Sequence, residues 1–357
     1  MTSNTRKILQ SGLTALSACG LTRWCRKKQT GACILMYHGF SNGKHRGLEN
    51  HSRLHLDIKG FRHTAKVLKK HYNVIPLQLL ADMMAAGQTI PPNTVVLTFD
   101  DGYASNYHLA LPVLEEMGLH ATVFASTGFI EGEMYQWPDR IEYAIDHCPS
   151  ETLKLNFPGL PEELSLKNIE QRKQALLLLD PALKKIPQGR HLESIDHIEQ
   201  AAGVALADDP NPADIYRPLT WDQLRELEKS KYASIGAHTH VHAILGHCPP
   251  SFARQDMRRC TELLKEKGGV ENPTFAYPNG QPGDYNQETR EILKDLGYSV
   301  ALTTVMEFNP SDQDLLTLKR MGTPRNGYQA DTICSGLMHR VKPPLVDACR
   351  KFIPINA

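Results

Sequence analysis

A short apolar run that ends in two carboxylates is the feature that most constrains how this chain folds. Residues 94–99, Thr-Val-Val-Leu-Thr-Phe, are β-branched or apolar, which is typical of a parallel strand covered on both faces. Asp100, Asp101 and Gly102 follow at once. Gly102 permits a tight turn that can aim both carboxylates into a cleft. Because adjacent carboxylates are costly to bury, we expect one to ligate a metal ion while the other accepts a proton.

A cluster of histidines forms the second half of the predicted site. It follows a strand-like stretch at residues 232–235 and contains His238, His240 and His242. If the chain turns helically there, the pair four residues apart converges on one point. With one aspartate, two imidazoles make a three-ligand metal site that leaves positions open for water and substrate. A solvated loop is the alternative for a single histidine, whereas a cluster opposite an acidic pair favours a site.

Together, these two motifs resemble those of a known enzyme family. Residues 98–102 are similar to the first motif of the NodB-homology polysaccharide deacetylases, carbohydrate esterase family 4, and residues 238–242 are similar to the second. Both motifs occur in the family's order, and the resemblance spans roughly residues 34–327. It implies a distorted (β/α) barrel and a carbohydrate deacetylase activity.

The resemblance also implies a role for each residue of the two motifs. In the family, the first aspartate is the catalytic base and the second binds the metal. By that match Asp100 is the base, and Asp101, His238 and His242 are the metal ligands. His240 falls on a free position of the second motif, so the resemblance implies that it is not a ligand.

A third stretch, residues 275–280, is similar to the family's third motif but departs from it. Ala276 stands where the family commonly has an arginine that braces the catalytic aspartate, and Arg140 and Arg320 are the candidates to replace it. The backbone N–H of Asn279 occupies the place that would stabilise the tetrahedral oxyanion, a role that needs only a backbone donor. The same residues also fit a simple turn, and the two interpretations are compatible.

The general acid is expected at the other end of the chain. The family's usual last motif, Leu-x-His, is absent from residues 318–321. Instead residues 34–39, Ile-Leu-Met-Tyr-His-Gly, look like the permuted subgroup that includes the poly-N-acetylglucosamine deacetylases, in which a histidine on the first strand takes the acid's position. This resemblance implies His38 as the acid, and the alternative is a histidine that merely closes a strand.

Strand-like and helix-like segments alternate along the chain, which indicates an α/β protein with a parallel sheet and crossover helices. We predict a leading segment at residues 1–30 and a barrel over 31–357, with the site at the carboxyl ends of its strands. Residues 141–217 are polar and helix-prone, so we expect a helical insertion, or lid, over one side of the barrel mouth. Trp137 introduces it, either as a packing residue or as a platform for a sugar ring.

Composition narrows the range of partners. The 357 residues carry a formal net charge of +1, which provides no field for nucleic acid. An N-acetylated glycan or a lipid-linked sugar therefore fits as substrate. The 8 cysteines form no Cys-x-x-Cys pair, so neither a structural zinc site nor a disulfide framework is indicated.

The amino terminus allows two locations. Residues 8–20 are weakly apolar between basic residues, and they are too short and too polar to span a membrane. They favour a cytoplasmic protein whose basic amphipathic lead contacts the membrane surface. Residues 16–19, Leu-Ser-Ala-Cys, resemble a lipobox, so the alternative is an exported lipoprotein anchored at Cys19.

The function predicted from the sequence is that of a metal-dependent hydrolase that removes N-acetyl groups from a sugar or a polysaccharide, such as one of the cell envelope. Zinc is the default ion for one carboxylate and two imidazoles, and nickel or cobalt also fits. Two alternatives stay open. One is an O-acetyl esterase or a non-sugar amidase on the same scaffold, and the other is a non-catalytic glycan-binding protein that retains the metal.

Overall fold

A computed structural model describes residues 21–157, 159–184, 186, 188–271 and 273–337 of the chain. Cys19 and the rest of the leading segment up to residue 20 lie outside this range, so the predictions of lipid anchoring and membrane contact stay predictions. Within the described part, no helix is long and apolar enough to cross a membrane.

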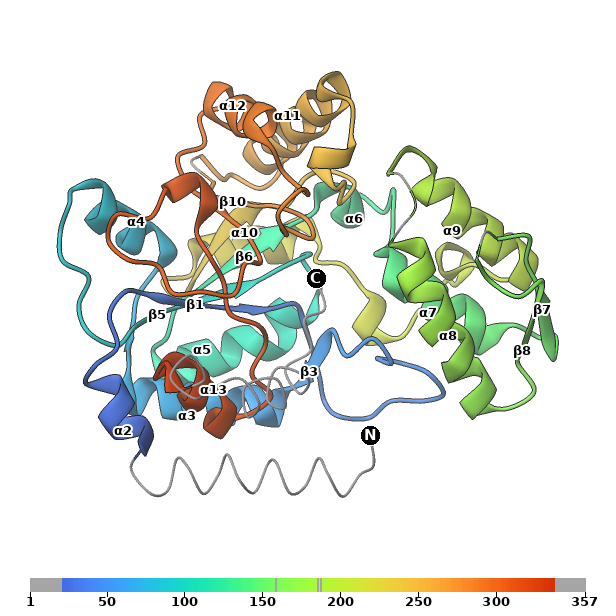
Figure 1. The fold of residues 1–357 in the computed structure, drawn as a ribbon, viewed down its shortest axis with the longest axis horizontal. Helices are drawn as coiled ribbons and strands as arrows, with labels where there is room; N and C mark the ends of the chain where they lie inside the picture. The colour runs from blue at the N-terminus through green and yellow to red at the C-terminus, as the bar shows by residue number, and fades with distance from the viewer. Residues whose placement is uncertain (1–20, 158, 185, 187, 272, 338–357) are drawn as a thin grey trace.

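The centre of the fold is a curled sheet in which every strand pair is parallel (Figure 1). Its strands run in the order β1-β5-β6-β9-β10-β11, and β4 also pairs with β5. The strands are β1 Cys33–Tyr37, β4 Asn73–Val74, β5 Thr94–Phe99, β6 Ala121–Ala125, β9 Ala233–Ala237, β10 Phe275–Ala276 and β11 Ala301–Leu302. The run at 94–99 is thus the buried strand that the sequence predicts.

A short segment near the carboxyl end closes the curled sheet. Leu318 forms a parallel bridge with Leu302 of β11, and Met321 forms one with Leu35 of β1. Residues 318–321 therefore lie between the last strand and the first. This closure makes the sheet a distorted barrel, as predicted, with the carboxyl ends of its strands at one mouth.

Helices cover the outside of the barrel (Figure 1). Apolar stripes position them: on α3, Phe61, Ala65 and Leu68 are all buried against the sheet. Thr220 begins α10 with a capping box, as its side chain accepts the N–H of Gln223. The helices of this part are α2 Leu21–Arg26, α3 Ile58–His71, α4 Leu77–Ala85, α5 Leu111–Met117, α6 Thr127–Ile130, α10 Trp221–Lys229, α11 Pro250–Glu266, α12 Gln287–Asp295 and α13 Gly327–Cys334.

The insertion stands beside the barrel as a unit with its own apolar core (Figure 1, right). It comprises α7 Trp137–His147, β7 Thr152–Lys154, β8 Glu163–Ser165, α8 Ile169–Leu183 and α9 Gln188–Ala202. Helix α7 begins four residues before the predicted boundary at 141, and the antiparallel β7–β8 pair adds strands to a segment predicted as helical. Alternation of Thr152, Leu153 and Lys154 across a two-stranded ribbon explains the difference, since only Leu153 is buried.

A small pair of parallel strands lies between the barrel and the insertion. Strand β2, Gly39–Ser41, pairs with β3, His55–Asp57, and the loop that joins them extends toward α7 and α8 (Figure 1). Gly39 is required there, because a Cβ at that position would lie 2.0 Å from Nδ1 of His55.

Candidate active site

The two acidic residues of the site sit where β5 ends. The N–H of Asp100 still donates to the carbonyl of Tyr37 at 2.8 Å, so this residue continues the sheet. Asp101 then turns into the left-handed region with φ 75°, and Gly102 follows with φ 87°. A Cβ on Gly102 would lie 3.3 Å from Cα of Ala125, so the turn is packed tightly against β6. The predicted turn therefore presents both carboxylates at the barrel mouth.

The structure brings Asp101, His238 and His242 together. One ligand atom from each lies within 4.8 Å of the other two. Oδ1 of Asp101 is 3.4 Å from Nε2 of His242 and 3.6 Å from Nε2 of His238. The chemistry of this donor set, one carboxylate and two imidazoles, fits a divalent transition metal.

The ring of His238 is held in the orientation that metal binding needs. Its Nδ1 lies 2.8 Å from the carbonyl of Ala276, an acceptor only, so Nδ1 carries the proton and the lone pair of Nε2 faces Asp101. Ala276, which stands in the place of the family's arginine, therefore contributes its backbone oxygen to the site.

The histidines converge through an irregular loop, and not through the helical turn considered for the sequence. Thr239 and His242 have left-handed φ values of 64° and 53°. The carboxylate of Asp256 on α11 accepts the N–H of His240 and that of Val241, each at 3.0 Å. One buried side chain thus fixes the loop where a helix would have used its own hydrogen bonds.

The ring of His240 is directed away from the three predicted ligands. Its Nδ1 lies 2.9 Å from Oγ1 of Thr127, and its Nε2 lies 2.9 Å from a carboxylate oxygen of Glu133. Both ring nitrogens are therefore engaged outside the Asp101 cluster, which agrees with the expectation that His240 is not a ligand.

Of the two arginines that the sequence offers as candidates to brace Asp100, Arg320 is the one that lies beside it. Its Nη1 donates to Oδ1 of Asp100 at 2.7 Å, and its Nε donates to the carbonyl of Thr303 at 2.9 Å. Arg140 instead pairs with Asp196 and Glu199 in the insertion. Arg320 comes from the segment that closes the barrel, so a residue remote in sequence supplies the bracing that Ala276 lacks.

Burial and charge set the ionisation of the acidic groups. Burial raises the pKa of Asp100, but the charge and hydrogen bond of Arg320, together with the neighbouring His238 and His38, more than offset it, and the pKa ends below its usual range. The pKa of Asp101 is raised well above its usual range by burial and then by the neighbouring charge of Asp100. A cation at Asp101 is what would offset that cost, so the protein environment fits a bound metal there.

The imidazoles of the site are held neutral. Burial is the largest cause that lowers the pKa of His238 and of His242. Neutral imidazole is the form that ligates metals. His38, at the end of β1, is also buried, and burial lowers its pKa to about 4. Asn106 donates to the His38 carbonyl at 2.7 Å, which fixes this residue at the mouth.

Asn279 presents an unpaired backbone donor to the site. Its φ is left-handed at 60°, and its side chain donates to Asp284 at 2.6 Å. Within the described part of the chain, its N–H has no hydrogen-bond partner. Asn279 lines the same pocket as Asp100 and Asp101, and the oxyanion role of its N–H stays a prediction.

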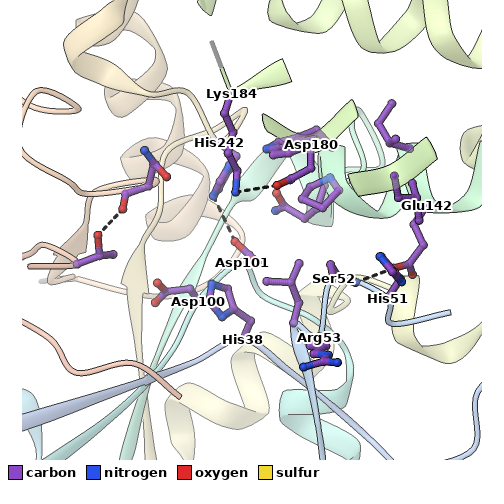
Figure 2. A pocket seen from close by; sticks show the side chains of 18 of the residues that line it. His38, His51, Ser52, Arg53, Asp100, Asp101, Glu142, Asp180, Lys184 and His242 are labelled. Atoms are coloured by element: carbon purple, nitrogen blue, oxygen red, sulfur yellow. Dashed lines mark hydrogen bonds and ion pairs between the residues drawn. The ribbon is translucent and has the colours of Figure 1, made fainter. Parts of the chain in front are cut away.

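One pocket joins the barrel mouth to the insertion (Figure 2). Its cavity volume is about 520 Å³. His38, both aspartates, the two predicted histidine ligands and Asn279 line one side. Most of the remaining walls come from the loop before β3, from helices α7 and α8, and from the C-cap residue of α8, which contribute His51, Ser52, Arg53, Leu54, Trp137, Ile141, Glu142, Leu176, Leu177, Asp180 and Lys184.

Several residues that build the site carry no signal that the sequence could have revealed. Asp256 lies in an amphipathic helix, where an acidic residue is expected to be exposed. Glu142 likewise lies on a helix but is buried beside the pocket. Their hydrogen bonds to distant backbone N–H groups follow only from the packing of the helices.

Comparisons with known proteins agree with this geometry. The sequence profile described as "Polysaccharide deacetylase" matches residues 87–301, more than half of the chain. YxkH of Bacillus subtilis (strain 168), which carries the name of a polysaccharide deacetylase, is 34% identical over 92 residues. That match covers 26% of this chain and 30% of YxkH, so the chain aligns with under a third of this relative.

Solved structures share the fold at low sequence identity. The deacetylase PplD of Streptococcus pyogenes, solved in complex with acetate, is 18% identical, with a TM-score of 0.55 over 88% of this chain and 99% of its own. IcaB of Ammonifex degensii is also 18% identical, with a TM-score of 0.54 over 86% of this chain and 98% of its own. These likenesses cover a larger share of the chain than the match over residues 87–301 does.

Proposed function

This chain belongs to the polysaccharide deacetylase family, and from that premise we propose that it hydrolyses N-acetyl groups on a glycan with the aid of a divalent metal. One observation supports this activity most strongly. Asp101, His238 and His242 converge in the same pocket as Asp100, whose carboxylate is held by Arg320. A metal site and an ionised base side by side are the two parts that amide hydrolysis requires.

Asp101, His238 and His242 would hold the ion, with zinc as our first choice and nickel or cobalt as alternatives. When bound, such an ion supplies Lewis acidity toward the acetyl carbonyl and lowers the pKa of water. Asp100, kept ionised by Arg320, accepts the proton of the attacking water. The N–H of Asn279 donates to the developing oxyanion.

His38 is our candidate for the group that protonates the departing amine. Since burial lowers its pKa to about 4, it enters the reaction neutral at neutral pH. It can serve as an acid only after it has gained a proton during the attack step. Asp100 lies close enough to favour the charged form of His38, so the proton released from water has a short route to it.

The alternatives differ in what they would release. An O-acetyl esterase yields acetate without a new amine, and an amidase for other substrates is inactive on sugars. The non-catalytic alternative rested on the missing arginine at Ala276 and on the missing Leu-x-His motif near the carboxyl end. Arg320 beside Asp100 answers the first of these reasons, and His38 is our candidate to answer the second. We therefore favour the N-deacetylase, with an N-acetylated polysaccharide or lipid-linked sugar as substrate.

The test is acetate release from a panel of N-acetylated oligosaccharides and lipid-linked N-acetyl sugars. The purified full chain is stripped with a chelator, and zinc, nickel or cobalt is then added back. We expect acetate and an equal amount of new free amine, only in the presence of metal. Acetate without amine would support the esterase, and binding of the glycans without turnover would support the glycan-binding protein.

A further inference from the structure

The pocket extends well beyond the groups that the chemistry uses, and its outer walls come from two segments outside the barrel. We propose that these walls form a subsite for the sugar unit joined to the one that loses its acetyl group, and that Glu142 is the positioning residue that holds the walls together. This inference rests on the proposed function. It adds where the rest of the glycan is bound and which residues select it.

The composition of the outer wall suits a sugar ring. Trp137, Ile141 and Leu177 present apolar surface, and Leu177 is 59% exposed, which is unusual for a leucine beside a pocket. Asp180 and Lys184 lie next to them, with Oδ2 and Nζ 3.4 Å apart (Figure 2). A sugar has C–H faces that pack on apolar side chains and hydroxyl groups that bond to charged ones, so this mixture matches both of its surfaces.

The position of the wall sets what can occupy it. Asp180, Lys184 and Trp137 line the same cavity as Asp101 and His242. One glycan can therefore place its acetyl group at the barrel mouth and another of its units against the insertion without leaving this cavity. The unit adjacent to the acetylated sugar is the part of a glycan that is close enough to do so.

Glu142 connects the two segments that make the walls. It lies on α7, is 2% exposed, and accepts the N–H of Asn50 at 2.7 Å and that of Ser52 at 3.1 Å. The hydroxyl of Tyr216 donates to it at 2.9 Å. Closely spaced backbone N–H groups that point at one carboxylate form an anion-binding nest. The left-handed backbone of Asn50, with φ 60°, allows the loop to adopt this shape.

The same loop is also fixed to the barrel side. The Asn50 side chain donates to the carbonyl of His55 at 2.8 Å and accepts the His55 N–H at 2.9 Å. His55 begins β3, so Asn50 is held from both directions. Residues 51–54, which line the pocket, are thereby set between the insertion and the barrel. Removing the Glu142 carboxylate would free this loop from α7 without touching the barrel mouth.

The test compares substrates that fill the subsite with substrates that do not. Pentamers of N-acetylglucosamine with β-1,4 or β-1,6 linkages extend past the acetylated unit, whereas 4-nitrophenyl acetate reaches only the barrel mouth. For Trp137→Ala and Glu142→Gln we expect KM for the preferred pentamer to rise about tenfold, a difference of about 1.4 kcal/mol. The value of kcat should change less than twofold, and kcat/KM for the ester should fall far less than for the pentamer. Trp137→Phe should restore part of the affinity.

Glu199→Gln is the matched control. Glu199 is also buried in the insertion, where it pairs with Arg140, but it does not line the pocket. We expect its pentamer kinetics to equal those of the wild type. An equal rise of KM in Glu199→Gln and Glu142→Gln would show general loosening of the insertion and would overturn the assigned role of Glu142.

Failure of the subsite and failure of the proposed function give different results. If the wild type deacetylates monomeric N-acetylglucosamine as efficiently as either pentamer, the proposal of a subsite is rejected. The proposed deacetylase activity is then still supported. If no substrate is turned over, calorimetric binding of the pentamers to the metal-loaded chain decides the subsite alone. Binding that Trp137→Ala weakens about tenfold would support it, and equal affinity for monomer and pentamer would reject it.

Discussion

Two ion pairs that contribute side chains to the pocket, one at the barrel mouth and one on the insertion, are held in opposite ways. At the mouth, Arg320 and Asp100 are fully enclosed and come from positions 220 residues apart. On the insertion, Asp180 and Lys184 are 52% and 42% exposed, and they lie four residues apart at the carboxyl end of α8. Enclosed pairs between distant segments keep one geometry, whereas exposed pairs within a helix contribute little and rearrange easily. The barrel is thus built for chemistry, and the insertion can adapt to a ligand.

The largest effects are expected at the barrel mouth, where Asp101 is predicted to bind the metal and Asp100 to act as the base. Asp101→Asn should lose the metal and all activity, because it removes a ligand. Asp100→Asn should keep the metal and lose activity by about 10²–10⁴-fold, because it removes only the base. Elemental analysis and acetate release measure the two effects. Equal metal loss in both variants would contradict the division.

His38→Ala tests whether the first strand belongs to the reacting centre. We expect kcat on an N-acetyl sugar to fall by about 10²–10⁴-fold with metal content unchanged, since the amine can no longer be protonated. The loss should shrink on 4-nitrophenyl acetate, whose leaving group needs no proton. A variant that remains fully active on the N-acetyl sugar would remove His38 from the mechanism.

Leu179→Ala probes the independence of the insertion. Leu179 is fully buried in the apolar core of the insertion, and its truncation should cost about 2–5 kcal/mol of stability. Hydrogen exchange should rise in α7, α8 and α9 and stay unchanged in the barrel strands. Metal content should be that of the wild type. Metal loss together with faster exchange in β5 would show that the two regions unfold as one.

A pair of helix caps gives the smallest expected effect. Asn168 caps α8 of the insertion through the N–H of Gln171, and Thr220 caps α10 of the barrel through the N–H of Gln223. Each change to alanine should cost about 1 kcal/mol in a urea unfolding experiment. Thr220→Ala should lower the urea concentration at which the barrel unfolds. Asn168→Ala should lower only the urea concentration at which the insertion unfolds. Identical transitions for both variants would mean that the two regions are not separable.

The barrel side of the site could be predicted because its residues follow strands directly. A buried apolar run fixes where β5 ends, so Asp100 and Asp101 must appear at the mouth. His238 and His242 follow β9 in the same way, although the loop that carries them is held by Asp256 and not by helical turns. Strand periodicity carries this information locally.

The remaining parts depend on packing between distant segments, which local patterns do not encode. Arg140 and Arg320 were equivalent candidates in the sequence, and only the closure of the barrel places Arg320 beside Asp100. The pairing of Glu142 with the backbone of Asn50 likewise depends on how the insertion docks. The strand-like stretches at residues 274–277 and 299–303 predict two strands, but β10 and β11 span only two residues each, because the residues beside them continue into buried loops.

The closure of the barrel by residues 318–321 also orders events during synthesis of the protein. When a ribosome has released residues up to β11, the three predicted metal ligands are present, but β1 and β11 still lack the segment that joins them. Asp100 would at that stage be a buried carboxylate without its arginine, which is costly. The nascent chain therefore gains its last sheet neighbour and the arginine that braces Asp100 in the same step, so the proposed hydrolysis would begin only when the barrel is complete.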